Sequence, residues 1–410
     1  MTLLPRKTAV IVFVAFACAY FLSALVRAIT ATLSPVLTQE FDLQARDLGL
    51  LAGAYFLGFS AMQLPLGKLL DSHGPKRVLL GFLAVSVAGC LAFSFAVTFP
   101  GLFAARMLCG IGLSACLMAP LTGFRRWLSP AAQLRSNSWM LMTGSLGMIA
   151  STLPVQWLMP IVGWRTLFVG LAAMTTVAMA AIAWKVPAWA PTAAGGATGT
   201  TREAYGQVWR HPYFRALVPV GFFCYGGLLA IQTLWAGPWM VKVAGYSALD
   251  AATGMFWINV SMLCTFWVWG AGAPWLARQG WDADRLMVRG LPISFALLAA
   301  NIAWTGALPA WSGALLAAYC MACSCVTLSQ PAVGMAFPPA LAGRALSAFN
   351  LVIFLGVFAV QWGIGLAIDG MVSLGLAQAH AFRVAMAAFL LCCIASYAHF
   401  LHAARHNPRT

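Results

Sequence analysis

The chain has 410 residues, of which 62% are hydrophobic and only 8% charged, and its formal net charge is +15. Ordinary soluble domains are about 25% charged, so this composition excludes a soluble protein and indicates a membrane protein. The basic residues form no run interleaved with exposed aromatic residues, which argues against a nucleic-acid partner. The positive-inside rule, which concentrates Lys and Arg in cytoplasmic loops, explains the positive charge instead.

Hydrophobic runs long enough to span a bilayer follow one another along the whole chain. A span needs about 20 apolar residues, and twelve runs meet that length. The first run, from Thr8 onward, is too long for the hydrophobic region of a signal peptide, so we interpret it as a first span. The runs lie at about 8–36, 48–70, 77–98, 101–123, 136–159, 165–184, 216–242, 251–272, 288–307, 311–335, 346–368 and 382–403.

The longest hydrophilic gap lies between Lys185 and Arg215 and separates two sets of six runs. It contains a Gly-, Ala- and Thr-rich stretch over 191–200, which is typical of a flexible linker. We therefore predict an all-α membrane protein with an N-terminal six-helix bundle over 1–184, a cytoplasmic linker over 185–215 and a C-terminal six-helix bundle over 216–410.

The two halves also resemble each other. Tyr20 and Arg27 are seven residues apart in the first span, and Tyr225 and Gln232 have the same spacing in the seventh. Such an internal repeat predicts pseudo-two-fold symmetry, with a transport site at the interface of two related bundles.

The distribution of basic residues predicts the orientation. With the N-terminus inside the cell, the cytoplasmic segments hold all Lys and Arg residues outside the spans except Arg46, Arg165, Lys242 and Arg383. The positive-inside rule therefore predicts that both termini are cytoplasmic.

The stretch Gly67-Lys-Leu-Leu-Asp71-Ser-His-Gly74-Pro-Lys76-Arg77 is a polar interruption between two spans. Gly74 with the following proline predicts a tight turn, Arg77 a cytoplasmic position, and Gly67 a close approach of two helices. Asp71 is a lone carboxylate at a helix end, where it needs a cation or a helix N-terminus as partner.

This pattern closely resembles the G-x-L-x-D-x-x-G-x-[KR]-[KR] signature of the major facilitator superfamily. A second stretch, Arg106-Met-Leu-Cys-Gly110-Ile-Gly112, is similar to the R-x-x-x-G-x-G pattern of the same family. The resemblance implies a twelve-helix secondary transporter that is usually monomeric, with Gly67, Asp71, Gly74, Arg77 and Arg106 as gating elements. It also implies a buried arginine and close helix contacts at the glycines of the second pattern.

Arg27 is the leading candidate for contact with a substrate. A guanidinium within a span costs at least about 2.5–3.5 kcal/mol on insertion scales, so it should face a wet cavity or a partner. Tyr20, Ser23, Arg27 and Thr30 follow at steps of three or four residues and share one side of the helix. A guanidinium there fits an anionic substrate, although it also fits a brace for a neighbouring helix or a side chain that reaches the interface.

The other polar groups inside the spans are neutral, and each could bind substrate or join two helices by a hydrogen bond. Those we expect to line the site, with Arg27 and Tyr20, are Tyr55, Gln63, Tyr225, Gln232, Trp235, Asn350 and Gln361.

Acidic residues fall only in loops or at span ends. A proton-coupled carrier usually needs a protonatable group near the midplane. Either Asp369 or Asp71 serves, or the substrate carries the proton, or transport is not coupled to protons; a coupling proton therefore stays an open partner.

Cys320-x-x-Cys323-x-Cys325 raises the alternative of metal transport, because thiolates suit copper. No Met or His pair accompanies these thiols, so we expect packing residues and no metal or other cofactor. No nucleophile and base are spaced as in an enzyme site.

We therefore expect a carrier in a bacterial inner membrane that moves a small polar solute, with an organic anion favoured because Arg27 is positive. The alternative is a proton-coupled multidrug exporter, although the Gly-Pro-x-x-Gly-Gly element of such exporters is missing from the fifth span. A non-transporting receptor or assembly factor on the same scaffold is the third possibility.

Overall fold

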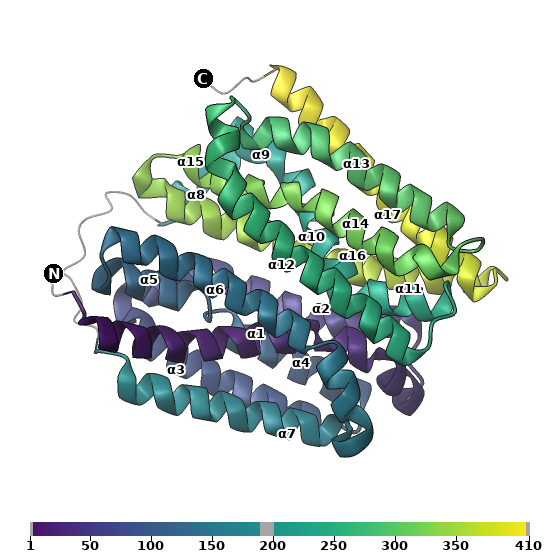
Figure 1. Cartoon of the computed structure of the whole chain (residues 1–410), viewed down its shortest axis with the longest axis horizontal. Helices are drawn as coiled ribbons and strands as arrows, with labels where there is room; N and C mark the ends of the chain where they lie inside the picture. Colours follow the sequence, from purple (N-terminus) through teal and green to yellow (C-terminus); the bar gives the residue numbers. More distant parts are fainter. Residues whose placement is uncertain (1–2, 189–200, 407–410) are drawn as a thin grey trace. The chain divides into compact units, whose positions relative to one another are not determined.

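The computed structural model describes residues 3–188 and 201–406, and every regular element in those ranges is a helix (Figure 1). The helices of the first part are α1 (Arg6–Phe41), α2 (Ala45–Ala61), α3 (Gln63–Phe95), α4 (Phe99–Leu113), α5 (Met118–Trp127), α6 (Pro130–Ala150) and α7 (Leu153–Lys185).

The second part begins with α8 (Thr201–Arg210), a short helix ahead of the next long hydrophobic run. The run that follows it is built from α9 (Pro212–Val220), η1 (Gly221–Tyr225), α10 (Gly226–Ala230), η2 (Ile231–Trp235) and α11 (Ala236–Lys242). The remaining elements are α12 (Ala248–Arg278), α13 (Ala283–Trp304), η3 (Pro309–Trp311), α14 (Ser312–Cys323), η4 (Ser324–Leu328), α15 (Ser329–Met335), α16 (Pro339–Ser373) and α17 (Gln378–His406).

All twelve predicted hydrophobic runs lie mostly on these helices, so the all-α prediction is confirmed. Ten helical stretches in the described ranges are long and apolar enough to cross a membrane. The second run is divided between α2, which has 17 residues, and the start of α3. The fifth run, 136–159, is divided between α6 and α7, and α6 begins with the polar residues Gln133, Arg135 and Asn137.

The predicted turn at Gly74 is confirmed. Gly74 has φ of 75° inside α3, where Pro75 follows, so α3 is two helical segments joined by a sharp bend. A positive φ strains any residue with a Cβ atom, and glycine adopts it freely. Gly163 makes the same kind of bend in α7, with φ of 71°.

The described residues pack as two compact units. Unit 1 takes its residues from 1–29 and 54–197, and unit 2 from 30–53 and 198–410. Unit 2 therefore includes the end of α1 and the start of α2, along with α8 to α17. Our division at 185–215 stays a prediction, and residues 189–200 of the predicted linker lie outside the described residues.

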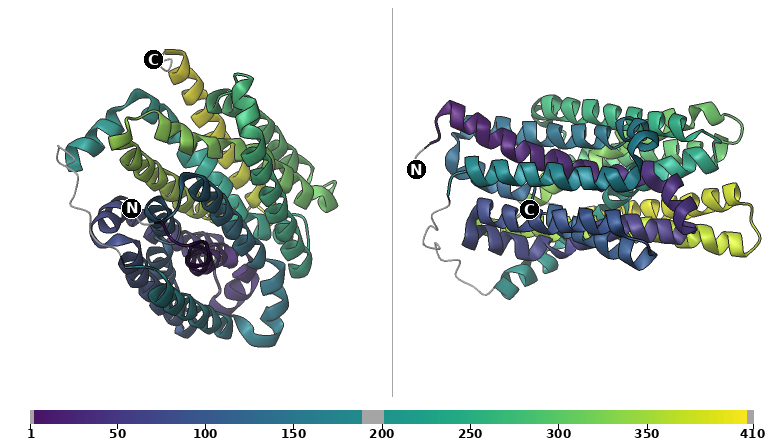
Figure 2. Two further views of the ribbon diagram at one scale, coloured as in Figure 1. Left: turned by 60° about the vertical axis from the view of Figure 1, so that its left-hand side comes forward. Right: turned by 90° about the horizontal axis from the view of Figure 1, so that it is seen from below.

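In unit 1, α3 packs against α4 and α7, and its helices run side by side (Figure 2). A Cβ added at Gly110 would lie 1.9 Å from the carbonyl oxygen of Tyr55, and one at Gly112 would lie 2.3 Å from the backbone nitrogen of Ser86. Both glycines therefore allow the close helix contacts that the resemblance implied. A Cβ at Gly67 would meet no atom within 4 Å, so the close approach predicted there is wrong for this structure.

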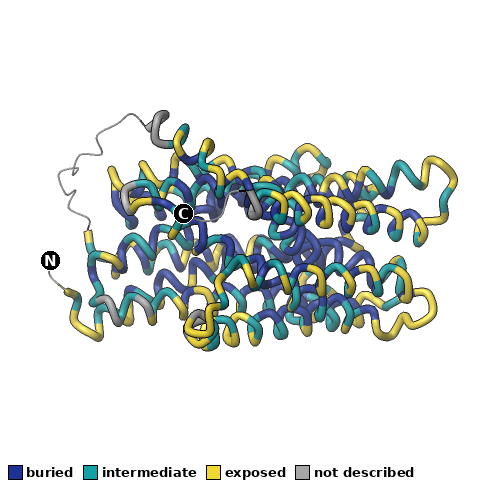
Figure 3. Tube along the Cα trace, turned by 90° about the horizontal axis from the view of Figure 1, so that it is seen from above, coloured by how far each residue is buried: buried dark blue, intermediate teal, exposed yellow. Residues whose placement is uncertain are grey.

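In unit 2, α16 packs against α10, η1 and α17, and α14 packs against α12 and α13. Exposed residues dominate the turns at the helix ends (Figure 3). Large apolar side chains along the helices are also exposed, including Trp184 at 80% and Trp267 at 67%. Such contact of large apolar residues with the surroundings is expected of helices in lipid.

Candidate functional site

Two arginines lie inside unit 1. Arg27 on α1 is partly buried, and Arg106 on α4 is 0% exposed. Arg106 donates from Nη1 to the carbonyl oxygen of Val26, at 2.9 Å, and so holds α4 against α1 next to Arg27. The Nε and Nη2 groups of Arg106 and the Nε group of Arg27 have no hydrogen-bond partner among the described residues. The buried arginine implied by the second pattern is confirmed at Arg106.

Tyr55 on α2 lies close enough to both guanidinium groups to interact with them electrostatically. The Cζ atom of Arg106 is 5.3 Å from the centroid of the Tyr55 ring, a cation–π distance. The Tyr55 hydroxyl donates to the carbonyl oxygen of Ser23, at 3.4 Å. The Ser23 hydroxyl donates to the carbonyl oxygen of Leu113, at 3.3 Å. These contacts hold Tyr55, α1 and α4 together around the arginines.

Unit 1 offers almost no negative charge to balance these cations. Asp71 is the only acidic residue in the sequence ranges 1–29 and 54–197, and it lies exposed in the turn region of α3. A desolvated guanidinium that lacks a carboxylate partner attracts any anion that can reach it. The ligand that best fits this part of unit 1 is therefore an anion.

Two predicted gating residues of the turn are accessible, whereas Gly74 is buried. Asp71 and Arg77 are exposed, and no ion pair of Asp71 occurs within the described ranges. Lys76 donates to the carbonyl oxygen of Val186, at 2.8 Å, which attaches the turn to the end of α7. The role of these residues as gating elements stays a prediction.

Two other predicted residues of unit 1 are held by local contacts. The Tyr20 ring packs on α6, where a Cβ at Gly144 would lie 2.6 Å from it. Gln63 is 4% exposed and donates from Nε2 to the carbonyl oxygen of Phe59, one turn earlier, at 3.2 Å. Neither of these contacts involves Arg27 or Arg106, so the role of Tyr20 and Gln63 in binding stays a prediction.

Unit 2 carries neutral amides in its interior. Gln232 is 5% exposed and donates from Nε2 to Oδ1 of Asn259, at 2.8 Å, which joins η2 to α12. Asn259 donates in turn to the carbonyl oxygen of Met255, at 2.9 Å. Each amide therefore satisfies part of the other's hydrogen-bonding capacity.

Gln361 on α16 is 0% exposed and forms a second polar contact with η2. Its side-chain Nε2 group donates to the hydroxyl of Thr233, at 3.0 Å, and its backbone carbonyl oxygen accepts from the indole of Trp235, at 3.1 Å. The side-chain Oε1 atom of Gln361 has no partner among the described residues. That atom is an unused acceptor, suited to a donor such as a hydroxyl group.

Two further predicted residues of unit 2 are Asn350 on α16 and Tyr225 in η1. The Asn350 side-chain oxygen accepts from Nε2 of Gln330. Tyr225 ends the π-helical turn η1, and Gln232, Thr233 and Trp235 lie in a second π turn, η2. π turns are rare and occur often at functional sites.

Sequence reasoning placed Ser23 on the side of the helix that carries Arg27 but not among the site residues, and it did not single out Thr233, which follows Gln232. It also missed the pair Cys90 and Cys109, whose sulfur atoms are 3.8 Å apart between α3 and α4. In the described part of the chain no three His, Cys, Asp or Glu side chains are arranged to hold a metal ion. The metal-transport alternative therefore gains no support from Cys320, Cys323 and Cys325.

Comparison with known proteins identifies the family of this chain. The model of the Major Facilitator Superfamily matches residues 16–361. The chain belongs to this superfamily. Members and relatives are transporters rather than enzymes, and the predicted resemblance is confirmed.

Several superfamily relatives are named for organic anions. The probable sulfoacetate transporter SauU of Cupriavidus necator is 25% identical over 251 residues, which cover 57% of this chain and 57% of that protein. The 4-hydroxybenzoate transporter PcaK of Pseudomonas putida is 28% identical over 36% of this chain and 33% of its own length. The 3-(3-hydroxy-phenyl)propionate transporter of Escherichia coli is 37% identical over 20% of each chain. The alignments thus span little more than half of these relatives at most.

Solved structures agree on the superfamily fold. A bacterial homologue of the human lysosomal transporter Spinster, inward-facing and unoccupied, superposes with a TM-score of 0.76 at 16% identity over 98% of both chains. A D-xylose–proton symporter superposes with a TM-score of 0.75, also at 16% identity and 98% coverage of both. At this identity the likeness carries the fold alone.

Proposed function

We propose that the protein transports a small organic anion across the bacterial inner membrane by alternating access. The observation that carries the proposal is the pair Arg27 and Arg106, whose guanidinium groups keep unpaired N–H donors in a unit with one acidic residue. The names of the sulfoacetate and 4-hydroxybenzoate transporters support the same substrate class.

In this proposal the chain acts as a monomer of twelve transmembrane helices in two six-helix bundles, with both termini cytoplasmic and no cofactor. Arg27 binds the anionic group, and Arg106 adds positive potential while it holds α1 in place. The neutral part of the substrate meets the other predicted residues, Tyr20, Tyr55, Gln63, Tyr225, Gln232, Trp235, Asn350 and Gln361.

A ligand panel read by thermal stability in detergent tests the proposal. The panel contains sulfoacetate, 4-hydroxybenzoate, 3-(3-hydroxyphenyl)propionate, inorganic phosphate, an amine, a sugar and tetraphenylphosphonium. A ligand that binds the folded state stabilises it by mass action, by about 2.7 kcal/mol at a concentration of one hundred times Kd. We expect organic anions to raise the melting temperature of the wild type with increasing concentration.

Three variants identify the residue responsible. Arg27→Gln should abolish the response to anions, and Arg27→Lys should keep part of it, because the charge remains without the planar fork. Arg278→Gln, which removes an exposed charge at the end of α12, should respond like the wild type. A response to anions that survives unchanged in Arg27→Gln would overturn the role of Arg27.

The multidrug exporter remains the second candidate because the interior of unit 2 is neutral and partly aromatic, as at Trp235 and Gln361. If tetraphenylphosphonium stabilises the wild type and Arg27→Gln alike while anions have no effect, this second function replaces the first.

A further inference from the structure

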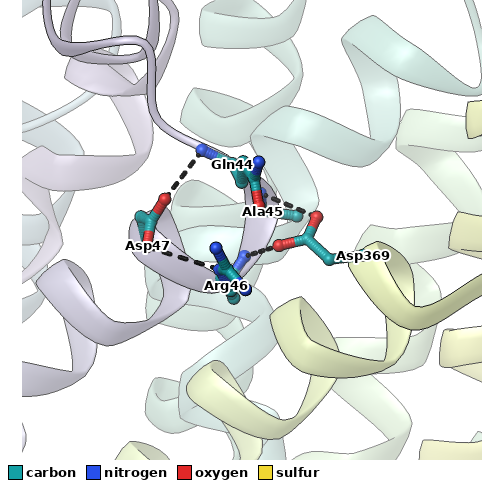
Figure 4. Close-up of polar contacts among 5 residues, drawn as sticks. All are labelled: Gln44, Ala45, Arg46, Asp47 and Asp369. Atoms are coloured by element: carbon teal, nitrogen blue, oxygen red, sulfur yellow. Dashed lines mark hydrogen bonds and ion pairs between the residues drawn. The ribbon is translucent and has the colours of Figure 1, made fainter. Parts of the chain in front are cut away.

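The start of α2 is capped by a carboxylate from the other half of the sequence (Figure 4). Asp369, near the end of α16, accepts a hydrogen bond from the backbone N–H of Ala45 on Oδ1, at 3.1 Å. Its Oδ2 atom accepts another from the backbone N–H of Arg46, at 2.8 Å. One carboxylate therefore holds two successive backbone donors that lie more than 300 residues away in the sequence.

These donors belong to the first turn of α2, where backbone N–H groups have no partner within the helix. The adjoining N–H of Gln44 is capped locally, by Oδ2 of Asp47 at 3.1 Å. A carboxylate at this position is stabilised by the positive end of the helix dipole, and its hydrogen bonds are charge-assisted. The contact of Asp369 is thus electrostatic and directional.

Glycines let the two helices meet closely beside this cap. A Cβ at Gly365 on α16 would lie 2.4 Å from the carbonyl oxygen of Ala45. A Cβ at Gly49 on α2 would lie 2.3 Å from the carbonyl oxygen of Gln361, and one at Gly53 would lie 2.8 Å from the ring of Phe358. The contact between α2 and α16 therefore extends over more than two turns of helix and leaves no room for side chains at these glycines.

We propose that Asp369 and the backbone of Ala45 and Arg46 form a latch that holds the extracytoplasmic ends of α2 and α16 together and must release in each transport cycle. The inference rests on the proposed function, because only alternating access requires these helices to separate. The positive-inside rule predicts that this end lies outside the cell, because basic residues are sparse near Arg46 and Arg383.

The latch biases the carrier toward the state that is closed on that side. When the two helices separate, both hydrogen bonds of the Asp369 carboxylate break, and the carboxylate and the two N–H groups bind water instead. The difference in free energy between the two states therefore includes the latch, and weakening the latch raises the population that is open to the outside.

Cysteine labelling in cells measures that population without any substrate. The parent chain carries Ala52→Cys, a position on α2 that is 2% exposed and lies on the helical face of Gly49 and Gly53. The exposed cysteines Cys18, Cys264 and Cys392 are replaced by serine, and the other native thiols are buried. A membrane-impermeant maleimide is added from outside, and the chain that lacks Ala52→Cys gives the background rate.

Asp369→Asn should raise the labelling rate about tenfold, a factor that corresponds to about 1.4 kcal/mol. Asp47→Asn, which weakens the local cap on Gln44 and the exposed ion pair with Arg46 but leaves both hydrogen bonds of Asp369, should change the rate less than about twofold. Gly365→Ala provides a second test without any change of charge, because its Cβ would press on the carbonyl of Ala45. Its matched control is Gly363→Ala on the same helix, where a Cβ meets no atom within 4 Å.

The latch is overturned if Asp369→Asn and Gly365→Ala both label at the parent rate. If the parent binds anions in the thermal assay but neither variant labels faster, the latch alone is wrong. If both variants label faster while no anion binds, the latch stands and the proposed substrate is wrong.

Discussion

The interiors of the two units differ in charge. Unit 1 contains Arg27 and Arg106, whose unused N–H donors have no acidic neighbour inside the unit. Unit 2 contains amides that largely satisfy one another, such as Gln232 with Asn259. Burying an unbalanced charge lowers the stability of the fold, whereas burying a hydrogen-bonded amide lowers it little. A functional role is therefore expected for the two arginines rather than for the amides. We therefore propose that unit 1 recognises the charge of the substrate and unit 2 its neutral polar groups.

Removing the buried charge of Arg106 should have the largest effect. In Arg106→Met we expect anion affinity to fall at least about tenfold, or about 1.4 kcal/mol, while the melting temperature without ligand stays equal or rises. The reason is that Arg106 forms one hydrogen bond yet keeps a desolvated charge. Thermal unfolding with and without an anion measures both quantities. A variant that melts at a lower temperature while keeping full affinity would mean that Arg106 is only structural.

Breaking the amide pair of unit 2 should affect stability rather than binding of the charged group. Asn259→Leu leaves Gln232 without its acceptor and should destabilise the protein by about 0.6 kcal/mol, with about 1.7 kcal/mol as the upper limit for such bonds in membranes. The double variant with Gln232→Leu should recover much of that loss, because both polar partners are then gone. A large loss of anion affinity in Asn259→Leu would contradict the assignment of charge recognition to unit 1 alone.

The unused acceptor of Gln361 should produce the smallest effect, and a selective one. We expect the wild type to prefer 4-hydroxybenzoate over benzoate by about 1 kcal/mol, the usual net value of a hydrogen bond. Gln361→Met should remove most of that preference while leaving the affinity for benzoate similar. Competition between the two acids in liposome uptake measures the preference. An equal preference in both proteins would show that Oε1 of Gln361 does not meet the hydroxyl.

Much of the fold could be predicted because the decisive signals are local. Hydrophobic runs of span length specify helices, and Gly74 before a proline specifies a turn. The resemblance of Arg106, Gly110 and Gly112 to a family pattern implied close packing of α4, which the structure shows at both glycines. Each of these predictions needs only the neighbours in sequence, and each agrees with the structure.

The partners of the site residues could not be predicted in the same way. Gln232 could bond to substrate or to any facing helix, and the choice of Asn259 depends on how η2 and α12 are packed. The π turns η1 and η2 displace side chains from the regular helical spacing, and no residue pattern in the sequence predicted these turns. Asp369 was a lone acidic residue at a span end, and its sequence neighbours gave no indication of α2.

The cap on α2 has a consequence for which residues can vary. Its donors are backbone N–H groups, so nineteen of the twenty amino acids can supply them at positions 45 and 46, whatever their side chains. Proline is the exception, and at position 45, the first residue of α2, it would fit the helix while removing one donor. Homologues could therefore differ freely at Ala45 and Arg46 while the carboxylate on α16 stays fixed. The contact of Asp369 with α2 would then produce no covariation between pairs of residues, and it could be recognised only from the backbone geometry.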